Sequence, residues 1–346
     1  MDFIVEYGLF LAKSITALLF IVLLLGAVFS MSQRSKREGE DGQIEVTALH
    51  HRFEDWQDTM AYSVLPEGDY KKLQKDRKKQ EKAEKKGKKD SKPERKRLFV
   101  LDFDGDIQAS AVDNLREEIS AILTIIRPED EVLLRLESPG GLVHSYGLAA
   151  SQLLRLRQRN IPLTIAIDRV AASGGYMMAC TGTRLLAAPF AVIGSIGVVA
   201  QVPNIHRLLK KHDVDIELHT AGEHKRTLTM LGENTEEGRK KFVEELEETH
   251  VLFKEFVSEY RPQLDIDSIA TGEVWYGRRA VDKALIDEVA TSDDYLLSRR
   301  ETTDIFAVHY KQKRSLPERL GFAAEAAVDR GTWKIIEKLR NSRFIG

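Results

Sequence analysis

The stretch LTIAIDRVAASGGYMMAC, residues 163–180, decides how this chain folds. It opens with the short apolar run Leu163–Ile167, which favours a buried strand. A polar, glycine-marked turn follows the run, and the residues from Gly174 to Cys180 open a helix. The stretch therefore predicts a strand, a turn and a helix in that order, with Ser173 at the junction of turn and helix.

The same alternation of elements surrounds this stretch. Strands and helices are expected in turn at 98–103, 112–126, 132–136, 145–157 and 163–167. Strands that alternate with helices form βαβ units, which assemble into a mainly parallel sheet. A long amphipathic helix is expected at 234–259, opened by Thr235 with two glutamates in its first turn. The predicted fold class is therefore α/β.

Ser173 stands where the chemistry of an α/β protein is expected, because sites in open sheets form at the carboxyl ends of strands. A serine at a strand-to-helix junction exposes its hydroxyl beside free backbone N–H groups, as in a nucleophile elbow, although the G-x-S-x-G pattern is absent here. The alternative is that Ser173 only caps the following helix. The residue alone does not decide between the two roles.

Two other glycine-marked turns follow predicted strands. In Glu137–Gly141, paired glycines let backbone N–H groups approach a ligand and bind a developing oxyanion, although an ordinary Pro-Gly turn gives the same pattern. The turn Gly194–Gly197 either lines a substrate site or simply joins two core strands.

A nucleophilic serine needs a base that takes its proton. Among nine histidines, His144 is the serious candidate because it follows the first glycine loop. The other candidate is Lys225, which comes after an apparent strand at 214–219. A lysine accepts a proton only when it is uncharged, which requires burial. Spacing alone leaves Lys225 indistinguishable from a solvated surface charge.

Four motifs carry a resemblance to a known family. They are Ser138-Pro-Gly-Gly141, Ala171-Ala-Ser-Gly-Gly-Tyr176, Gly194-Ser-Ile-Gly-Val198 and Gly272-Glu-Val-Trp-Tyr-Gly-Arg278. In this order they resemble the signal peptide peptidase A family, the S49 serine peptidases, over residues 98–295. Two positions depart from the family pattern: Glu137 replaces a frequent Asn, and His224 replaces a more usual aromatic residue.

The resemblance implies roles for individual residues. Ser173 matches the family nucleophile, and Lys225, 52 residues downstream, matches the family's lysine base. The backbone N–H groups of Gly140 or Gly141 and of Gly174 would form the oxyanion hole. No metal and no nucleotide cofactor is implied.

The resemblance also implies a fold and an assembly, namely a ClpP/crotonase-like domain of repeated β-β-α units that forms a homo-oligomeric ring. The implied substrates are extended peptides, such as signal-peptide remnants or membrane-associated proteins. The expected domains are a membrane anchor at 1–30, an extension with a Lys-rich linker at 31–97, the peptidase domain at 98–295 and a tail at 296–346. Two other functions stay open, a crotonase-like acyl-CoA enzyme and a non-catalytic membrane scaffold.

The N-terminal segment GLFLAKSITALLFIVLLLGAV, residues 8–28, predicts a membrane contact. It has 21 residues and one charge, which matches a single bilayer span. A cleaved signal peptide is the alternative, but the first seven residues hold two acidic side chains and no basic one. The basic residues Arg34, Lys36 and Arg37 favour a cytoplasmic position for the peptidase domain, with the side left open. The family resemblance implies that the membrane is a bacterial inner membrane. The apolar stretch 185–202 contains Pro189 and two glycines, so we interpret it as strand-rich core.

The distribution of charged residues and the single cysteine bear on the partners and the bonding chemistry that can be expected. The net charge of -2 gives no overall bias, but residues 71–97 contain 15 Lys or Arg. We interpret this block as a solvated linker, extended or transiently helical, with attraction to anionic lipid as the alternative. No aromatic residues interleave these charges, so no nucleic-acid partner is expected. The single cysteine, Cys180, excludes an internal disulfide and is expected to be buried packing, with a reactive thiol as the alternative.

Overall fold

The computed structural model describes residues 42–87, 95–222 and 225–312. Residues 45–309 form one compact unit, and the described residues before and after them belong to a second unit. In chain order the elements are β1 (Gln43–Ala48), α2 (Leu49–Val64), α3 (Glu67–Gly87), β2 (Lys96–Asp104), α4 (Val112–Leu123), β3 (Glu131–Glu137), α5 (Val143–Arg157), β4 (Leu163–Ile167), β5 (Val170–Ala172), α6 (Gly174–Ala179), β6 (Arg184–Ala187), β7 (Val192–Gly194), α7 (His206–Lys211), α8 (Glu236–Tyr260), α9 (Ile266–Ile269), β8 (Val274–Tyr276), α10 (Gly277–Ala280), β9 (Glu288–Val289), α11 (Ser292–Arg299) and β10 (Thr303–Lys311).

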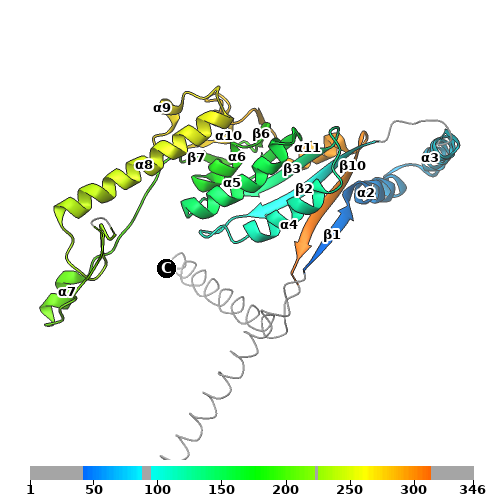
Figure 1. The fold of residues 1–346 in the computed structure, drawn as a ribbon. Coiled ribbons are helices and arrows are strands. Elements are labelled where there is room, and N and C mark those ends of the chain that lie inside the picture. Colours follow the sequence, from blue (N-terminus) through cyan, green and yellow to red (C-terminus); the bar gives the residue numbers. More distant parts are fainter. Residues whose placement is uncertain (1–41, 88–94, 223–224, 313–346) are drawn as a thin grey trace, which may run out of the picture. The chain divides into compact units, whose positions relative to one another are not determined.

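The larger sheet confirms the predicted parallel α/β class. Its seven strands follow the order β1-β10-β2-β3-β4-β6-β9 (Figure 1). Every pair of neighbouring strands from β10 across to β9 is parallel. The strands predicted at 98–103, 132–136 and 163–167 all lie in this sheet. Because β2, β3 and β4 are parallel neighbours, the loops that leave their carboxyl ends meet at one edge.

Both faces of this sheet are covered. On one face, α4 packs on β2, and α5 packs beside α4 and α6. On the other face, a buried cluster joins alternate strand residues to α11 of the C-terminal part; its members are Leu98, Val100, Leu133, Ala166, Leu186, Tyr295, Leu296 and Ile305. Leu49 and Phe53 of α2 pack against this cluster. Apolar burial on two faces gives the sheet a rigid core from which the site loops extend.

A smaller sheet positions the loop that follows β7. Its order is β5-β7-β8, with β5 and β7 parallel and β7 and β8 antiparallel. Ala172 pairs with Gly194, so the 194–197 turn lies beside the start of α6. The predicted core character of 185–202 holds only as far as Ile196, which is fully buried, because Val199 beyond it is 91% exposed.

Several segments differ from what the sequence predicts. The strand expected at 214–219 is wrong: this stretch is irregular and exposed. Its alternating pattern suits a sheet edge, but within the described chain only Val214 of this stretch donates a backbone hydrogen bond, to Leu209. The linker expected at 71–97 begins as part of α3, and the polar region before it contains β1 and α2. Mixed polar composition hid these elements, because the part of α2 that packs against the core cluster is limited to Leu49 and Phe53 in its first turns.

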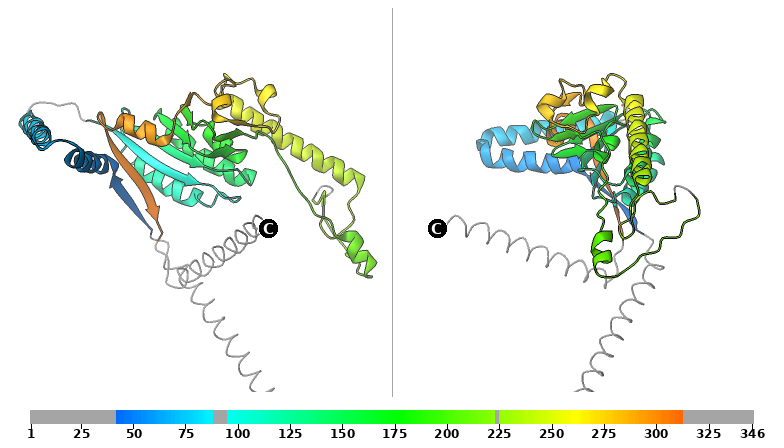
Figure 2. Two further views of the ribbon diagram at one scale, coloured as in Figure 1. Left: turned by 180° about the vertical axis from the view of Figure 1, so that it is seen from behind. Right: turned by 90° about the vertical axis from the view of Figure 1, so that its left-hand side faces the viewer.

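The long helix α8 confirms the prediction for 234–259 and its cap. The side chain of Thr235 accepts a hydrogen bond of 3.0 Å from the N–H of Gly238. Figures 1 and 2 show α8 running from the sheet outward to the region of α7.

Among the helices that the structure describes, none is long and apolar enough to cross a membrane. The predicted span at 8–28 lies outside the described residues.

Candidate active site

Ser173 has a strained backbone at the junction of β5 and α6. Its φ is 52° and its ψ is −120°, a region that residues with a Cβ rarely adopt. Such strain persists only where surrounding contacts enforce it, and it concentrates at functional sites. Although Ser173 occupies the N-cap position of α6, its side chain makes no capping hydrogen bond. The hydroxyl of Ser173 therefore does not cap α6, which was the alternative role that the sequence left open.

Backbone hydrogen bonds hold Ser173 from both sides. Its N–H donates to the carbonyl of Gly194 over 2.8 Å, and its carbonyl accepts from the N–H of Met177 over 3.0 Å. The first bond comes from the 194–197 turn, and the second is the first turn of α6. The strained conformation is thus fixed by two separate segments of the chain.

The first glycine loop lies directly beside Ser173. Ser138 donates its N–H to Val170 and accepts from the N–H of Ala172, so the loop after β3 is tied to β5. Gly140 has a φ of +92°, and a Cβ added there would stand 2.7 Å from the carbonyl oxygen of Ala172. Only glycine fits this position without displacing the backbone that leads to the serine.

The backbone N–H groups around Ser173 are not equally available. The N–H of Gly140 donates to the Oγ of Ser138 over 3.1 Å. Within the described residues, the N–H groups of Gly141 and Gly174 donate to no protein acceptor. Gly174 is the first residue of α6, where unpaired N–H groups and the positive end of the helix dipole are expected. Gly141 and Gly174 are therefore free to bind a ligand oxygen.

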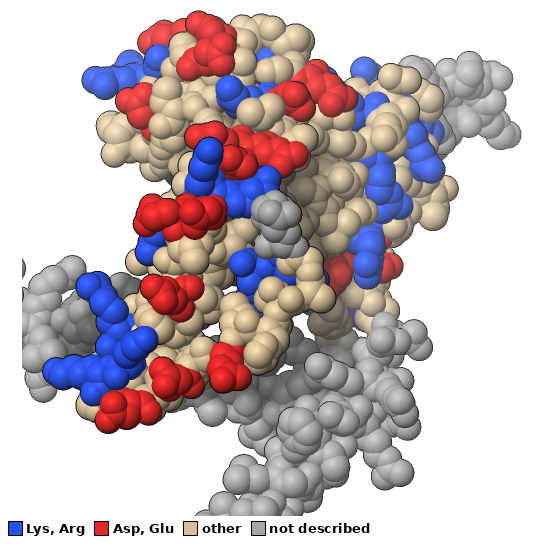
Figure 3. Space-filling model, turned by 60° about the vertical axis from the view of Figure 1, so that its left-hand side comes forward, with Lys and Arg blue, Asp and Glu red and all other residues tan. Residues whose placement is uncertain are grey.

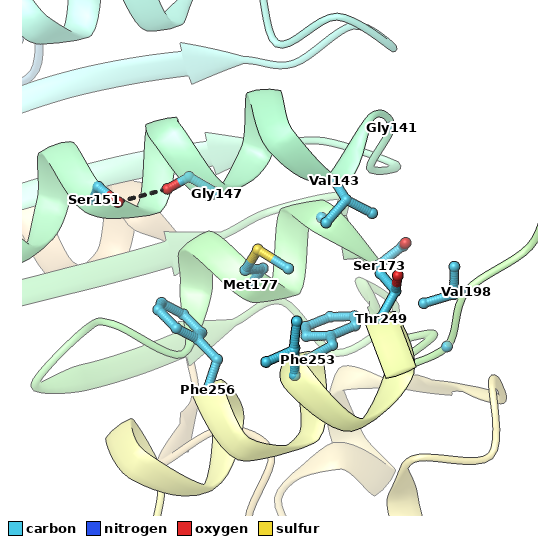
Figure 4. A pocket seen from close by; sticks show the side chains of 13 residues that line it. Gly141, Val143, Gly147, Ser151, Ser173, Met177, Val198, Thr249, Phe253 and Phe256 are labelled. Carbon is cyan, nitrogen blue, oxygen red and sulfur yellow. Dashed lines mark hydrogen bonds between the residues drawn. The ribbon is translucent and has the colours of Figure 1, made fainter. Parts of the chain in front are cut away.

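An apolar pocket of about 350 Å³ opens at Ser173 (Figure 4). Its walls come from α5, α6, α8 and the 194–197 turn. The large apolar side chains that line it include Val143, Met177, Leu252, Phe253 and Phe256. A cavity of this size and character accepts a large apolar side chain beside the serine hydroxyl.

Neither candidate base lines this pocket. Lys225 is exposed, and its backbone N–H donates to the carbonyl of Gly222 over 3.2 Å. His144 is also exposed, near the start of α5. An exposed basic side chain is common on this protein: Figure 3 shows lysines and arginines among acidic side chains over one face. Exposure therefore does not distinguish a catalytic base from an ordinary surface charge. Within the described part of one chain, the structure brings Ser173 together with the three glycines but not with Lys225.

Cys180 is packing, as expected. It is fully buried, and burial is the main reason that the pKa of its thiol lies above the ordinary value. Its Sγ donates to the carbonyl of Met177 over 3.2 Å. Across the described residues, no three His, Cys, Asp or Glu side chains form a group that could hold a metal ion.

Sequence reasoning missed the wall that α8 supplies. Thr249, Leu252, Phe253 and Phe256 share one side of that helix and line the pocket. Their spacing is the ordinary signature of a core-facing stripe, which gives no hint of a ligand. It also missed the contacts of Tyr146 behind the glycine loop, because a tyrosine inside a helical pattern is usually core.

A parallel α/β sheet that presents a strained serine beside free glycine N–H groups and an apolar pocket defines a serine hydrolase type of site. Comparison with known proteins specifies the class. The family model "Peptidase family S49 N-terminal" matches residues 2–153, and "Peptidase family S49" matches residues 155–305. The chain belongs to peptidase family S49, and by that membership it is a protease of the serine type.

Three relatives match along most of their length. The chain is 53% identical over 332 residues to Probable protease SohB of Haemophilus influenzae, covering 94% of each chain. It is 48% identical over 319 residues to Probable protease SohB of Buchnera aphidicola subsp. Acyrthosiphon pisum, covering 92% of this chain and 93% of the relative. It is 48% identical over 308 residues to Probable protease SohB of Buchnera aphidicola subsp. Schlechtendalia chinensis, covering 86% of this chain and 100% of the relative.

Proposed function

We propose that this protein is a membrane-anchored serine endopeptidase in which Ser173 is the nucleophile and Lys225 the general base. The observation that carries the proposal is the strained backbone of Ser173, whose uncapped hydroxyl stands at the mouth of an apolar pocket. Membership of peptidase family S49 supports the reaction class.

The proposed reaction is acyl transfer to serine followed by hydrolysis. An uncharged Lys225 takes the proton from the Ser173 hydroxyl while Oγ attacks the peptide carbonyl carbon. The carbonyl oxygen becomes an oxyanion, and the C–N bond then breaks as the lysine ammonium returns its proton to the leaving amine. The same lysine then takes a proton from water, and the water oxygen attacks the acyl-enzyme carbonyl carbon. The ester C–O bond to Ser173 breaks as the lysine ammonium returns its proton to Oγ, which releases the second peptide and the free serine.

We assign the oxyanion hole to the N–H groups of Gly141 and Gly174. The N–H of Gly140 is already engaged by Ser138, so its place in the loop is conformational. Removing one donor of such a hole typically costs about 3–4 kcal/mol of transition-state stabilisation. The two remaining glycines come from different loops and converge on the same serine.

Lys225 would reach Ser173 from a second copy of the chain. It lies in an arm, described at residues 198–222 and 225–231, that leads from the 194–197 turn toward α8 and is mostly exposed. The arm exposes a set of large apolar side chains, namely Val199, Val202, Ile205, Leu208, Val214, Ile216, Leu218, Met230 and Leu231. So much exposed apolar surface is typical of a protein interface. Burial of the arm against a neighbouring copy would also favour the uncharged amine that a base requires.

The remaining parts of the proposal concern architecture. The mainly parallel sheet, with the candidate site at the carboxyl ends of its strands, supports a ClpP/crotonase-like domain, and the apolar arm supports a homo-oligomeric ring. The segment 8–28 supports a single-pass anchor in a bacterial inner membrane. We keep the division into an anchor, an extension, a peptidase domain at 98–295 and a tail as part of the proposal.

The substrate would be an extended peptide with a large apolar side chain at the residue before the cleaved bond. The pocket beside Ser173 is lined by Phe253, Phe256 and Met177, which suit an apolar partner. Signal-peptide remnants and segments of membrane-associated proteins have this composition. Binding of the apolar side chain would hold the scissile carbonyl against the serine.

The test is covalent labelling of the purified full-length protein with a fluorophosphonate, followed by peptide mapping. The expected result is a single adduct on Ser173, and loss of both labelling and peptide hydrolysis in Ser173→Ala. Peptide hydrolysis that survives in Ser173→Ala would refute the assignment. Folding without labelling or turnover would favour a scaffold, and acyl-CoA turnover without labelling would favour a crotonase-like enzyme.

A further inference from the structure

We propose that Tyr146 is a positioning residue that sets the spacing between the two donors of the oxyanion hole. The inference rests on the proposed function, because it concerns the same serine site. Tyr146 lies on α5, outside the motifs that resemble the family, and it is completely buried. One end of its side chain supports the loop that carries Gly141, and the other end packs on Gly174.

The hydroxyl end belongs to a directed chain of hydrogen bonds. The Tyr146 hydroxyl donates to the carbonyl of Asp106 over 2.7 Å. Its single proton is thereby used, so at the 2.5 Å contact with Ser138 the serine Oγ donates and the tyrosine accepts. The Oγ of Ser138 in turn accepts from the N–H of Gly140 over 3.1 Å. Each donor in such a chain strengthens the next, so the glycine loop is held by a connected unit.

The ring end touches the other donor. A Cβ added to Gly174 would stand 2.5 Å from a ring carbon of Tyr146, which shows that the ring lies against the first residue of α6. The ring is itself fixed by an edge contact with Phe103 of β2, with the centroids 6.5 Å apart. A single rigid side chain therefore bridges Gly174 and the hydroxyl of Ser138.

The residues around Ser138 and Tyr146 are tightly packed against them. A Cβ on Gly105 would stand 2.5 Å from both the Ser138 and the Tyr146 hydroxyl oxygens, and one on Gly175 would stand 2.4 Å from the carbonyl oxygen of Ser138. Burial, its largest influence, raises the pKa of the tyrosine, so the hydroxyl stays protonated and keeps donating. The groups are bonded to one another directly and are buried, so removal of one hydroxyl leaves a buried partner unpaired.

Displacement of a donor affects the transition state more than the bound substrate. The negative charge on the carbonyl oxygen develops only as Ser173 attacks, and oxyanion-hole donors act on that charge. Substrate affinity depends on the apolar pocket, which Tyr146 does not line. Loss of the tyrosine hydroxyl should therefore lower kcat and leave KM nearly unchanged.

The experiment uses full-length protein in detergent and compares Tyr146→Phe with Tyr176→Phe. Tyr176 is a matched control, because it is also fully buried and its hydroxyl donates to a backbone carbonyl, that of Leu285, over 2.8 Å. Steady-state hydrolysis of a fluorogenic peptide gives kcat and KM, and inhibition by a matching peptide boronate reports binding of a tetrahedral oxyanion. Thermal denaturation reports stability.

For Tyr146→Phe we expect kcat to fall about 10- to 100-fold with KM within about twofold, and boronate affinity to fall in parallel with kcat. Tyr176→Phe should lose a similar amount of stability and keep its kcat. A Tyr146→Phe enzyme with normal kcat and boronate affinity, or with its loss confined to KM, would overturn the inference.

Ser138→Ala provides a second, independent route if Tyr146→Phe folds poorly. It breaks the same chain from the other side and should give the same loss of kcat, and the double variant should lose no more than either single one. Additive losses would contradict a shared chain. Ser173→Ala, measured in parallel, separates a failure of this inference from a failure of the proposed function. If Ser173→Ala is inactive and Tyr146→Phe is fully active, only the positioning role of Tyr146 is rejected. If Ser173→Ala is active, the serine mechanism itself is rejected.

Discussion

Gly140 lies directly against the proposed nucleophile, since a Cβ added to Gly140 would stand 2.7 Å from the Cβ of Ser173. Gly140 also holds a φ of +92°, and Ser173 a φ of 52°. Two unusual backbone conformations thus face one another across two loops that are 33 residues apart in the sequence. The position of the serine hydroxyl depends on both.

Gly140→Ala should therefore inactivate the enzyme. The new Cβ would push on Ser173 and on the carbonyl of Ala172, and a displacement of the reacting groups by about 1 Å costs roughly 100-fold in rate. Stability should fall by about 1–3 kcal/mol, because alanine is strained at this φ. Peptide hydrolysis and thermal denaturation measure the two effects. Gly68→Ala is the control, because nothing lies within 4 Å of a Cβ there; equal activity of the two variants would contradict the packing argument.

The pocket makes a prediction about specificity. Phe256→Ala should enlarge the end of the cavity formed by α8, so peptides with a bulkier apolar residue before the cleaved bond gain in kcat/KM relative to those with a smaller one. The change in the ratio should be at least about 10-fold, the lower end of what one methylene group contributes to discrimination in an apolar pocket. Profiling with a peptide library measures it.

Phe190→Ala is the matched control for specificity. It makes the same chemical change at a side chain that is 83% exposed and does not line the pocket. Its specificity profile should match that of the unaltered protein. A profile that changes equally in both variants would mean that this cavity does not receive the substrate side chain.

The local parts of the fold were predictable because their signals are local. The strand 163–167 and the caps and spacing of α8 follow directly from apolar periodicity and from Thr235. The parallel sheet followed from the alternation of such elements. In contrast, β10 pairs with β2 across more than 200 residues, and no short-range pattern in 303–311 announces its partner.

The candidate site was predictable in part. The sequence placed Ser173 and the glycines on adjacent strand ends, and the parallel register brings them together. It could not choose between Gly140 and Gly141, because that depends on which N–H the Oγ of Ser138 accepts. The strand expected at 214–219 failed because alternating polarity requires a neighbouring strand, and the described chain supplies none there.

Asp130 should control the acid stability of the domain. Its side chain is completely buried between the starts of β2 and β3, and it accepts from the N–H of Arg97 over 3.1 Å and from the N–H of Arg127 over 2.8 Å. Burial alone would raise the pKa of this carboxyl, but these bonds and the Arg97 guanidinium lower it overall. The ionised form therefore stabilises the fold above the ordinary value of 3.8, and this contribution is lost as the pH falls through the lowered pKa.

Asp130→Asn should lose about 2–4 kcal/mol of stability at neutral pH, because it weakens charge-assisted bonds in a buried site. The difference from the unaltered protein should shrink as the pH falls from the ordinary carboxyl pKa, where Asp130 of the unfolded chain becomes neutral, through the lowered pKa at which Asp130 of the folded protein becomes neutral. Urea unfolding at pH 7 and near pH 3 measures both values. The control is Asp113→Asn, at an exposed carboxyl on α4, which should change stability little at either pH. If Asp130→Asn is destabilised by the same amount at both pH values, the negative charge of Asp130 is not what stabilises the fold.

The last prediction concerns the origin of the base. If Lys225 acts on Ser173 of another copy, Ser173→Ala and Lys225→Ala should each be inactive alone, and mixing them should restore activity. In a mixed assembly, a Lys225→Ala copy contributes an intact serine and its Ser173→Ala neighbour an intact lysine. With equal amounts and random exchange, about a quarter of the sites should combine both groups.

This complementation should appear only after the subunits have exchanged, for example on coexpression or on refolding the two variants together. Labelling with a fluorophosphonate should then occur only on the Lys225→Ala copies, which alone retain the serine. Lys210→Ala, another lysine of the exposed arm, should be fully active by itself and serves as the matched control. An inactive mixture with proven exchange would place both groups in one chain, and an active Lys225→Ala would direct the search for the base to His144, because that side chain begins α5 next to the glycine loop.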